Sequence, residues 1–173
     1  FEDTVACPSL SEYAVCFAGM LTGDSSRFYR YFWECQELEP NWEYLQNTVS
    51  ETNLYGGRSQ VVYWQKGEGE LYRLAQSLKH LNHVVQNWQR GKDVWSRKGV
   101  AVSQMGSLPV TLYTGDRYDC NNAAIVPKSP KNLPALWAFC QSDEFRIYVR
   151  RIDSALKVTN ATLLKAVSYT HLT

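Results

Sequence analysis

The pattern of apolar and polar positions along the chain predicts short strands and two long helices. Apolar residues recur at helical spacing from Glu68 to Gln89 and again from Ala135 to Ile152. Short runs rich in β-branched and aromatic residues predict strands at 11–21, 27–35, 58–65, 99–104, 110–114 and 123–126. The predicted fold class is therefore α+β, with short, mostly antiparallel strands and two substantial helices.

Turn-forming residues predict how these elements are connected. The run Thr-Gly-Asp-Ser-Ser at 22–26 is typical of a turn, and it predicts a hairpin between the first two strands. Residues 36–57, interrupted by Pro40, are expected to form a loop, and residues 127–134 hold three of the six prolines and predict another. Residues 156–165 are expected to form a short mixed segment.

The charge is unevenly distributed, although the formal net charge of the 173 residues is only +1. Residues 1–51 carry two basic and nine acidic side chains, a net charge of −7, whereas residues 52–173 carry sixteen basic and eight acidic ones, a net charge of +8. A basic body suggests a polyanionic partner, and an acidic head beside it suggests contact between the two parts. The charge pattern alone does not distinguish a polyanionic partner from contact between the two parts of the chain.

The cysteines indicate in which cellular compartment the protein is found, and the two ends of the chain indicate whether the sequence is truncated. The five cysteines form no Cys-x-x-Cys pair and the three histidines have no cysteine at ligand spacing, so we expect no metal site and place the protein in the cytoplasm. No leader and no long apolar run is present, so we expect no membrane partner. Residues 166–173 resemble translated sequencing-adapter read-through, and we expect residues 1–165 to be a native region truncated at both ends.

Motifs for common catalytic chemistry are missing. The chain has neither a phosphate-binding Gly-rich loop, nor a Gly-x-Ser-x-Gly elbow, nor a His-Glu-x-x-His helix. His80 and His83 share a helix face without a nearby third ligand, and Asp143-Glu144 and Asp116/Asp119 lie in polar surroundings typical of solvated carboxylates. No catalytic, cofactor-binding or metal-ligating residue is predicted, and whether the chain is itself an enzyme is left open.

A basic stretch with an embedded aromatic residue is the clearest candidate site. Residues 90–98 hold four cations and one tryptophan, with a single acid, Asp93. Cationic side chains neutralise phosphates, and a tryptophan among them can stack on a base or insert into a base step. A solvated loop anchored by a buried tryptophan explains the same residues.

Three segments in order resemble the C-terminal target-recognition half of large, single-chain bacterial adenine-specific DNA methyltransferases of the Eco57I-like restriction-modification or phage-defence type. The first, 17–34, contains Thr-Gly-Asp at 22–24 and an aromatic strand ending in Trp-Glu, with Ser25 where the family usually has Asn. The second runs from 98 to 106 and through 109–113 to 123–127. The third joins 133–142 to 156–165. The resemblance is weaker over 58–90, where this chain carries a predicted helix and close members of the family differ widely from one another.

The resemblance implies a parent enzyme that transfers a methyl group from S-adenosylmethionine to adenine. Its cofactor pocket and catalytic motif would lie in a lobe N-terminal to Phe1, so this chain would supply grip and sequence recognition on double-stranded DNA. The DNA-binding residues expected from the resemblance and the basic stretch together are Thr22, Asp24, Arg27, Arg58, Lys66, Arg90, Lys92, Trp95, Arg97, Lys98, Ser103 and Gln104.

Two other classes of function remain open at this point. In a non-enzymatic interaction module the acidic head would pair with the basic body, and the aromatic residues would form core or a protein-binding patch. An aromatic-rich sugar-binding domain is the third hypothesis, and the free cysteines disfavour it.

Overall fold

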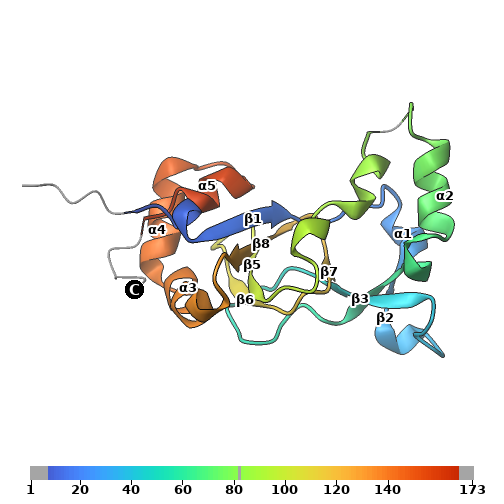
Figure 1. Cartoon of the computed structure of the whole chain (residues 1–173), viewed down its shortest axis with the longest axis horizontal. Coiled ribbons are helices and arrows are strands. Elements are labelled where there is room, and N and C mark those ends of the chain that lie inside the picture. The colour runs from blue at the N-terminus through green and yellow to red at the C-terminus, as the bar shows by residue number, and fades with distance from the viewer. Residues whose placement is uncertain (1–7, 82, 168–173) are drawn as a thin grey trace, which may run out of the picture.

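A computed structural model describes residues 8–81 and 83–167, which form two four-stranded sheets with helices at opposite ends of the molecule (Figure 1). Within this part of the chain one sheet has the strand order β1-β8-β5-β6 and the other β2-β4-β3-β7. The strands are β1 (Ala14–Ala18), β2 (Tyr29–Tyr31), β3 (Trp42–Gln46), β4 (Gln60–Tyr63), β5 (Gly99–Ser103), β6 (Val110–Tyr113), β7 (Arg117–Tyr118) and β8 (Asn122–Pro127). The helices are α1 (Ser25–Phe28), α2 (Glu70–Ser77), α3 (Leu133–Cys140), α4 (Asp143–Ile152) and α5 (Asn160–Leu164).

The first sheet is buried on both faces. Because side chains alternate along a strand, one face presents Val100, Val102 and Ile125 to α3, α4 and α5. The other face presents Ala101, Ala124 and Val126 to Tyr118 and Val94. This burial explains why the β5 and β8 sequences are nearly continuous apolar runs.

The second sheet packs on α2 and on the 3₁₀ helix η4 (Val85–Gln89), at the end of the molecule opposite to α3–α5 (Figure 1). Leu45 and Val62 from the sheet, Phe28 from α1 and Leu71 from α2 are almost fully buried in this second core. Tryptophan rings extend the core, since Trp64 contacts the rings of Trp88 and Trp95 at centroid distances of 5.3 and 5.4 Å.

Buried polar contacts join the two sheets. The Gln46 amide Nε2 donates to the Leu112 carbonyl at 2.9 Å, and the Asn122 amide Nδ2 donates to the Gln46 carbonyl at 3.2 Å. Residues 49–56 run beside β6, where the Leu112 amide donates to the Leu54 carbonyl at 3.2 Å. This segment covers the outer edge of the first sheet.

The predicted α+β class with mainly antiparallel strands is confirmed, and the one parallel pair among the described strands is β3 with β7. Both long helices were predicted with wrong bounds. In place of one continuous helix over 68–89, the structure has α2 at Glu70–Ser77 and η4 at Val85–Gln89, and Trp88 of η4 contacts Trp64. Residues 135–152 form α3 and α4, separated where the Ser142 hydroxyl caps α4 by accepting from the Phe145 amide.

The predicted hairpin and one predicted loop are also wrong. β1 pairs with β8 and β2 pairs with β4, because Asp24 in the connecting turn caps the short helix α1 and redirects the chain. The predicted loop 36–57 contains β3, a central strand of the second sheet.

The expected C-terminal tail begins with Ala166, which is fully buried and whose carbonyl accepts from the Leu10 amide at 2.8 Å. Cys7, His171 and residues 168–173 lie outside the described residues.

Candidate nucleic-acid interface

A group of cations gathers at one end of the first sheet, and the strand register explains why. Val100 lies opposite Ile125, so continuing the register places Arg97, two residues before β5, opposite Lys128, which directly follows β8. The Arg97 guanidinium donates to the Pro127 carbonyl at 3.2 Å, and the Lys128 ammonium donates to the Ser11 carbonyl at 2.9 Å. Both side chains are nonetheless exposed.

Arg58 brings a third chain segment to the same end of the sheet. Its guanidinium donates to the Leu112 carbonyl at 2.6 Å and to the Thr114 hydroxyl at 3.4 Å. The β5–β6 register places Thr114 opposite Lys98, which is exposed. We call Arg58, Arg97, Lys98 and Lys128 the basic edge.

The electrostatics of the basic edge favour an anionic partner. Burial lowers the pKa of the half-buried Arg58 from its ordinary value, with nearby Asp116 opposing this, and an arginine stays charged under all physiological conditions. Among the described residues, the four cations of the edge form no ion pair with a carboxylate. Protein acceptors orient three of these side chains, so the edge presents a partly ordered positive surface, which Asp116 partly offsets beside Arg58.

The other members of the predicted basic stretch lie elsewhere. Arg90 donates to the Gly19 carbonyl at 2.7 Å, at the end of β1 opposite to the basic edge. The two ends are four residues of β8 apart, about 13 Å. Gly91 lies so close to the Tyr118 ring that a Cβ atom would approach its hydroxyl to 2.5 Å, and Lys92 follows it in an exposed position. The stretch 90–98 therefore crosses the sheet instead of forming one patch.

Trp95 belongs to the core that joins the two sheets. Its half-buried ring is edge-on to Trp64, and the Arg117 guanidinium lies 4.4 Å from its centroid and 4.7 Å from that of Trp64. Arg117 also pairs with Glu43 at 2.7 Å. This position fits the alternative stated from the sequence, a tryptophan anchor beneath a loop, and a stacking role on a base does not fit it.

Direct base contact by Ser103 and Gln104 does not fit their burial, since the two residues are 4% and 2% exposed. The Ser103 hydroxyl accepts from the Val49 amide at 3.0 Å. The Gln104 amide donates to the Val158 carbonyl at 2.8 Å and to Asn160 Oδ1 at 3.1 Å. Both side chains fasten neighbouring segments to the end of β5.

The Thr-Gly-Asp motif has a structural role here. Thr22 is buried and its hydroxyl accepts from the Asp24 amide at 3.2 Å, while Asp24 caps α1 by accepting from the Arg27 amide at 3.2 Å. Arg27 pairs with Glu70 of α2 at 3.0 Å. Lys66 is exposed beyond the far end of β4, in a left-handed conformation with φ of +58°. None of these four lies at the basic edge.

Sequence reasoning missed Lys128, although a signal for it was present. Lys128 follows a strand that was predicted correctly, and two antiparallel neighbours place the end of one beside the start of the other. What the sequence lacked was the pairing of β8 with β5. Because β8 pairs with β5, basic residues at the ends of different strands lie next to one another and form one group.

Neither a metal cluster nor a membrane-spanning helix accompanies the basic edge in the described part of the chain. The described residues contain no group of three or more His, Cys, Asp or Glu side chains able to hold a metal ion. No helix within 8–81 and 83–167 is both long and apolar enough to cross a bilayer. Comparison with family models and with curated proteins gives no match for this chain.

Proposed function

We propose that this chain binds duplex DNA through the basic edge and serves as the target-recognition portion of an S-adenosylmethionine-dependent, adenine-specific DNA methyltransferase. The observation that carries the DNA-binding part is the convergence of Arg58, Arg97, Lys98 and Lys128 from three separate chain segments. The methyltransferase part depends on the sequence resemblance. Methyl transfer and cofactor binding are assigned to a different lobe of the parent protein.

The dimensions of the edge suit a DNA backbone. The edge crosses from β8 to β6, two strand spacings or about 10 Å. One DNA strand carries a phosphate for roughly every 3.4 Å of helix axis, so this width matches the axial rise of about three phosphates. Phosphate contacts of this kind position a protein on a duplex without specifying the sequence.

The test is the salt dependence of duplex affinity, measured by fluorescence anisotropy of a labelled duplex with the whole chain. The triple variant Arg97→Ala, Lys98→Ala, Lys128→Ala should lower affinity and reduce the slope of log K against log salt by about 0.9 for each phosphate that the variant no longer neutralises. The matched control Arg73→Ala, Lys79→Ala, Lys165→Ala removes three exposed cations elsewhere and should keep the slope close to that of the unmodified chain. Salt-independent binding would count against DNA as the partner, and an equal decrease in both variants would count against the basic edge.

A protein-binding function has one specific observation in its favour. Tyr31, Phe32, Trp33 and Tyr44 expose 42%, 42%, 62% and 46% of their surface on the second sheet and its adjoining turn. The acidic head is not neutralised by the basic body, because only one ion pair among the described residues, Glu43 with Arg117, joins them through an acid of the head. An exposed aromatic group with unpaired acids suits a basic protein segment.

A further inference from the structure

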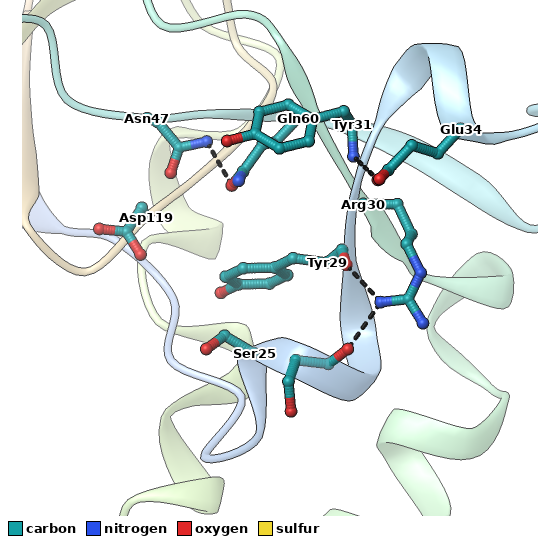
Figure 2. A pocket seen from close by; sticks show the side chains of 9 residues that line it. Ser25, Tyr29, Arg30, Tyr31, Glu34, Asn47, Gln60 and Asp119 are labelled. Atoms are coloured by element: carbon teal, nitrogen blue, oxygen red, sulfur yellow. Dashed lines mark hydrogen bonds between the residues drawn. The ribbon is translucent and has the colours of Figure 1, made fainter.

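A hollow beside the second sheet is lined by other residues than those of the basic edge. It has a volume of about 600 Å³ and lies between α1, β2, the end of β3 and the turn after β7. Figure 2 shows the rings of Tyr29 and Tyr31 reaching it from β2, with Asn47 and Asp119 on the other side. Its volume is in the ordinary range for sites that bind small molecules.

Two amide side chains give the hollow a matched donor and acceptor. Asn47 Nδ2 donates to Gln60 Oε1 at 2.9 Å and to the Leu45 carbonyl at 3.5 Å (Figure 2). These bonds leave Asn47 Oδ1 as an acceptor and Gln60 Nε2 as a donor, and neither atom has a hydrogen-bond partner among the described residues. Asn and Gln amides recognise bases through donor–acceptor pairs of this kind.

Asp119 adds a second acceptor at a fixed position. Its Oδ1 accepts from the Asn121 amide at 2.9 Å, which orients the carboxylate and leaves Oδ2 available. The Asp119 amide itself donates to the Gln46 carbonyl at 2.9 Å. The backbone of Asp119 is therefore bonded to the end of β3, and the Asn121 amide orients its carboxylate.

Aromatic rings offer a stacking surface at the same place. Tyr31 is stacked on Trp33 at a centroid distance of 4.7 Å and an interplanar angle of 11°, which leaves one face of the Tyr31 ring available. Burial, with a smaller contribution from Asp119, raises the pKa of Tyr29, so its hydroxyl stays protonated. Stacking on aromatic side chains is a common way to hold an unpaired base.

The charges at the hollow favour a neutral ring over a phosphate. The Arg30 guanidinium is bonded to the Ser26 and Tyr29 carbonyls at 2.6 and 2.7 Å, and Glu34 accepts from the Tyr31 amide at 2.8 Å. Asp119 then contributes an unpaired negative charge. Arg30 and Glu34 both line the hollow and offset each other's charge, so Asp119 makes the net charge of the lining negative. This disfavours a phosphate, whereas an amino group of a neutral ring can donate to the carboxylate.

We propose that this hollow binds an unstacked nucleobase whose edge presents an amino group beside an unprotonated ring nitrogen, as adenine and cytosine do. The amino group donates to Asp119 Oδ2 or Asn47 Oδ1, the ring nitrogen accepts from Gln60 Nε2, and the ring stacks on Tyr31. For a base in DNA the inference rests on the proposed function. Gln60 is two residues from Arg58 of the basic edge, so one short chain segment contributes to both the edge and the hollow.

The experiment compares bases in one strand context and as free nucleotides. Short single strands with one adenine, cytosine, thymine or guanine in an abasic background are measured by anisotropy, and AMP is titrated separately by calorimetry. We expect adenine and cytosine strands to bind about tenfold more tightly than thymine strands, as a single good donor–acceptor pair allows. A strand with 2-aminopurine at the same position should change its fluorescence on binding.

Matched variants assign the effect to the hollow. Gln60→Glu replaces the donor by an acceptor and should abolish the base preference, and Tyr31→Ala should weaken all four bases. Gln76→Glu makes the same chemical change on the exposed face of α2 and should leave the preference intact. Circular dichroism and the midpoint of thermal unfolding confirm that each variant is folded.

The outcomes separate this inference from the proposed function. Equal binding of all four bases, or an unchanged preference in Gln60→Glu, overturns the base site even if duplex binding at the basic edge persists. AMP binding that depends on Gln60, without any duplex binding, supports the base site and contradicts the proposed function. Displacement of the 2-aminopurine signal by tetramethylammonium ion at equal potency overturns the inference in favour of a cation site.

Discussion

The two sheets carry the same kinds of residue but use their cations differently. On the first sheet, Arg97, Lys98 and Lys128 lie at strand ends, where backbone carbonyls accept from two of them and no carboxylate neutralises them. On the second sheet and its adjoining helix α1, Arg117 is paired with Glu43 and Arg27 with Glu70, whereas Arg30 of β2 donates to backbone carbonyls and lines the same hollow as Glu34. The comparison teaches that a partner surface is indicated by cations without carboxylates, and that the number of cations in a segment is a poor guide to it.

The prediction with the largest expected effect on stability concerns whether the two sheets unfold as one cooperative unit. Phe145 packs α4 on the first sheet and Phe28 packs α1 on the second, and both are fully buried. Each change to Ala should lower the free energy of unfolding by about 3–5 kcal/mol, because it removes apolar contacts and leaves a cavity. Chemical denaturation followed by circular dichroism and tryptophan fluorescence should give one coincident transition for both variants. Separate transitions would show that the polar junction at Gln46 does not couple the sheets.

The next test compares two Arg–carboxylate pairs of different burial. Arg117 lies between the Trp64 and Trp95 rings, with its side chain 22% exposed, whereas Arg27 is 49% exposed. Arg117→Ala should cost about 2 kcal/mol, since it removes cation–π contacts and leaves Glu43 partly buried without its partner. Arg27→Ala should cost less than about 1 kcal/mol. Urea denaturation measures both, and equal costs would show that burial does not separate the two pairs.

Helix caps provide a smaller test, one on each sheet. Ser142→Ala should lower stability by about 1 kcal/mol, because the Phe145 amide loses its acceptor. Asp24→Ala should cost a similar amount at α1, and Asp24→Asn should restore most of it, since Asn also caps well. Duplex affinity should be the same in Asp24→Asn and in the unmodified chain. A selective loss of DNA binding in Asp24→Asn would restore the contact role expected from the sequence.

The smallest expected effect is a pH dependence near α5. The Ala155 amide, above all, and then the Thr162 hydroxyl donate to the Asp153 carboxylate and hold its pKa below its usual range. Because the folded-state pKa is depressed, this stabilisation is present above the unfolded pKa and is lost as the pH falls through the folded value. Thermal unfolding between about pH 6 and pH 2 should show a smaller acid-induced decrease for Asp153→Asn than for the unmodified chain. Identical pH profiles would contradict the assignment.

The cysteines show which properties can be predicted from local sequence and which cannot. Four of them, Cys16, Cys35, Cys120 and Cys140, are free in the described part of the chain, in agreement with the lack of any pairing pattern. Burial raises the pKa of the Cys16 and Cys140 thiols well above the usual range. Which of the cysteines are buried depends on the sheet and helix that cover them, and the spacing of cysteines in the sequence does not contain that information.

The α+β class and most strand positions followed from the sequence, because the two-residue period of a strand and the identity of turn residues are local properties. The strand at β3 was missed because Pro40 and the neighbouring acids are typical of a loop, and its burial comes from β4 and β7. The prediction of one long helix over 68–89 was wrong for a similar reason. Its apolar spacing is helical throughout, yet packing of Trp88 on Trp64 stabilises a bent arrangement.

For the candidate sites, the sequence supplied the residue types and the tertiary structure decided which of them can reach a ligand. The sequence could name Arg97 and Lys98, but their neighbour Lys128 and the burial of Gln104 depend on the β5–β8 pairing. The hollow lined by Gln60 and Asp119 draws on residues 59 positions apart, which no local pattern connects. The physical reason is that exposure and proximity arise from long-range contacts, whereas propensity and periodicity arise from neighbours along the chain.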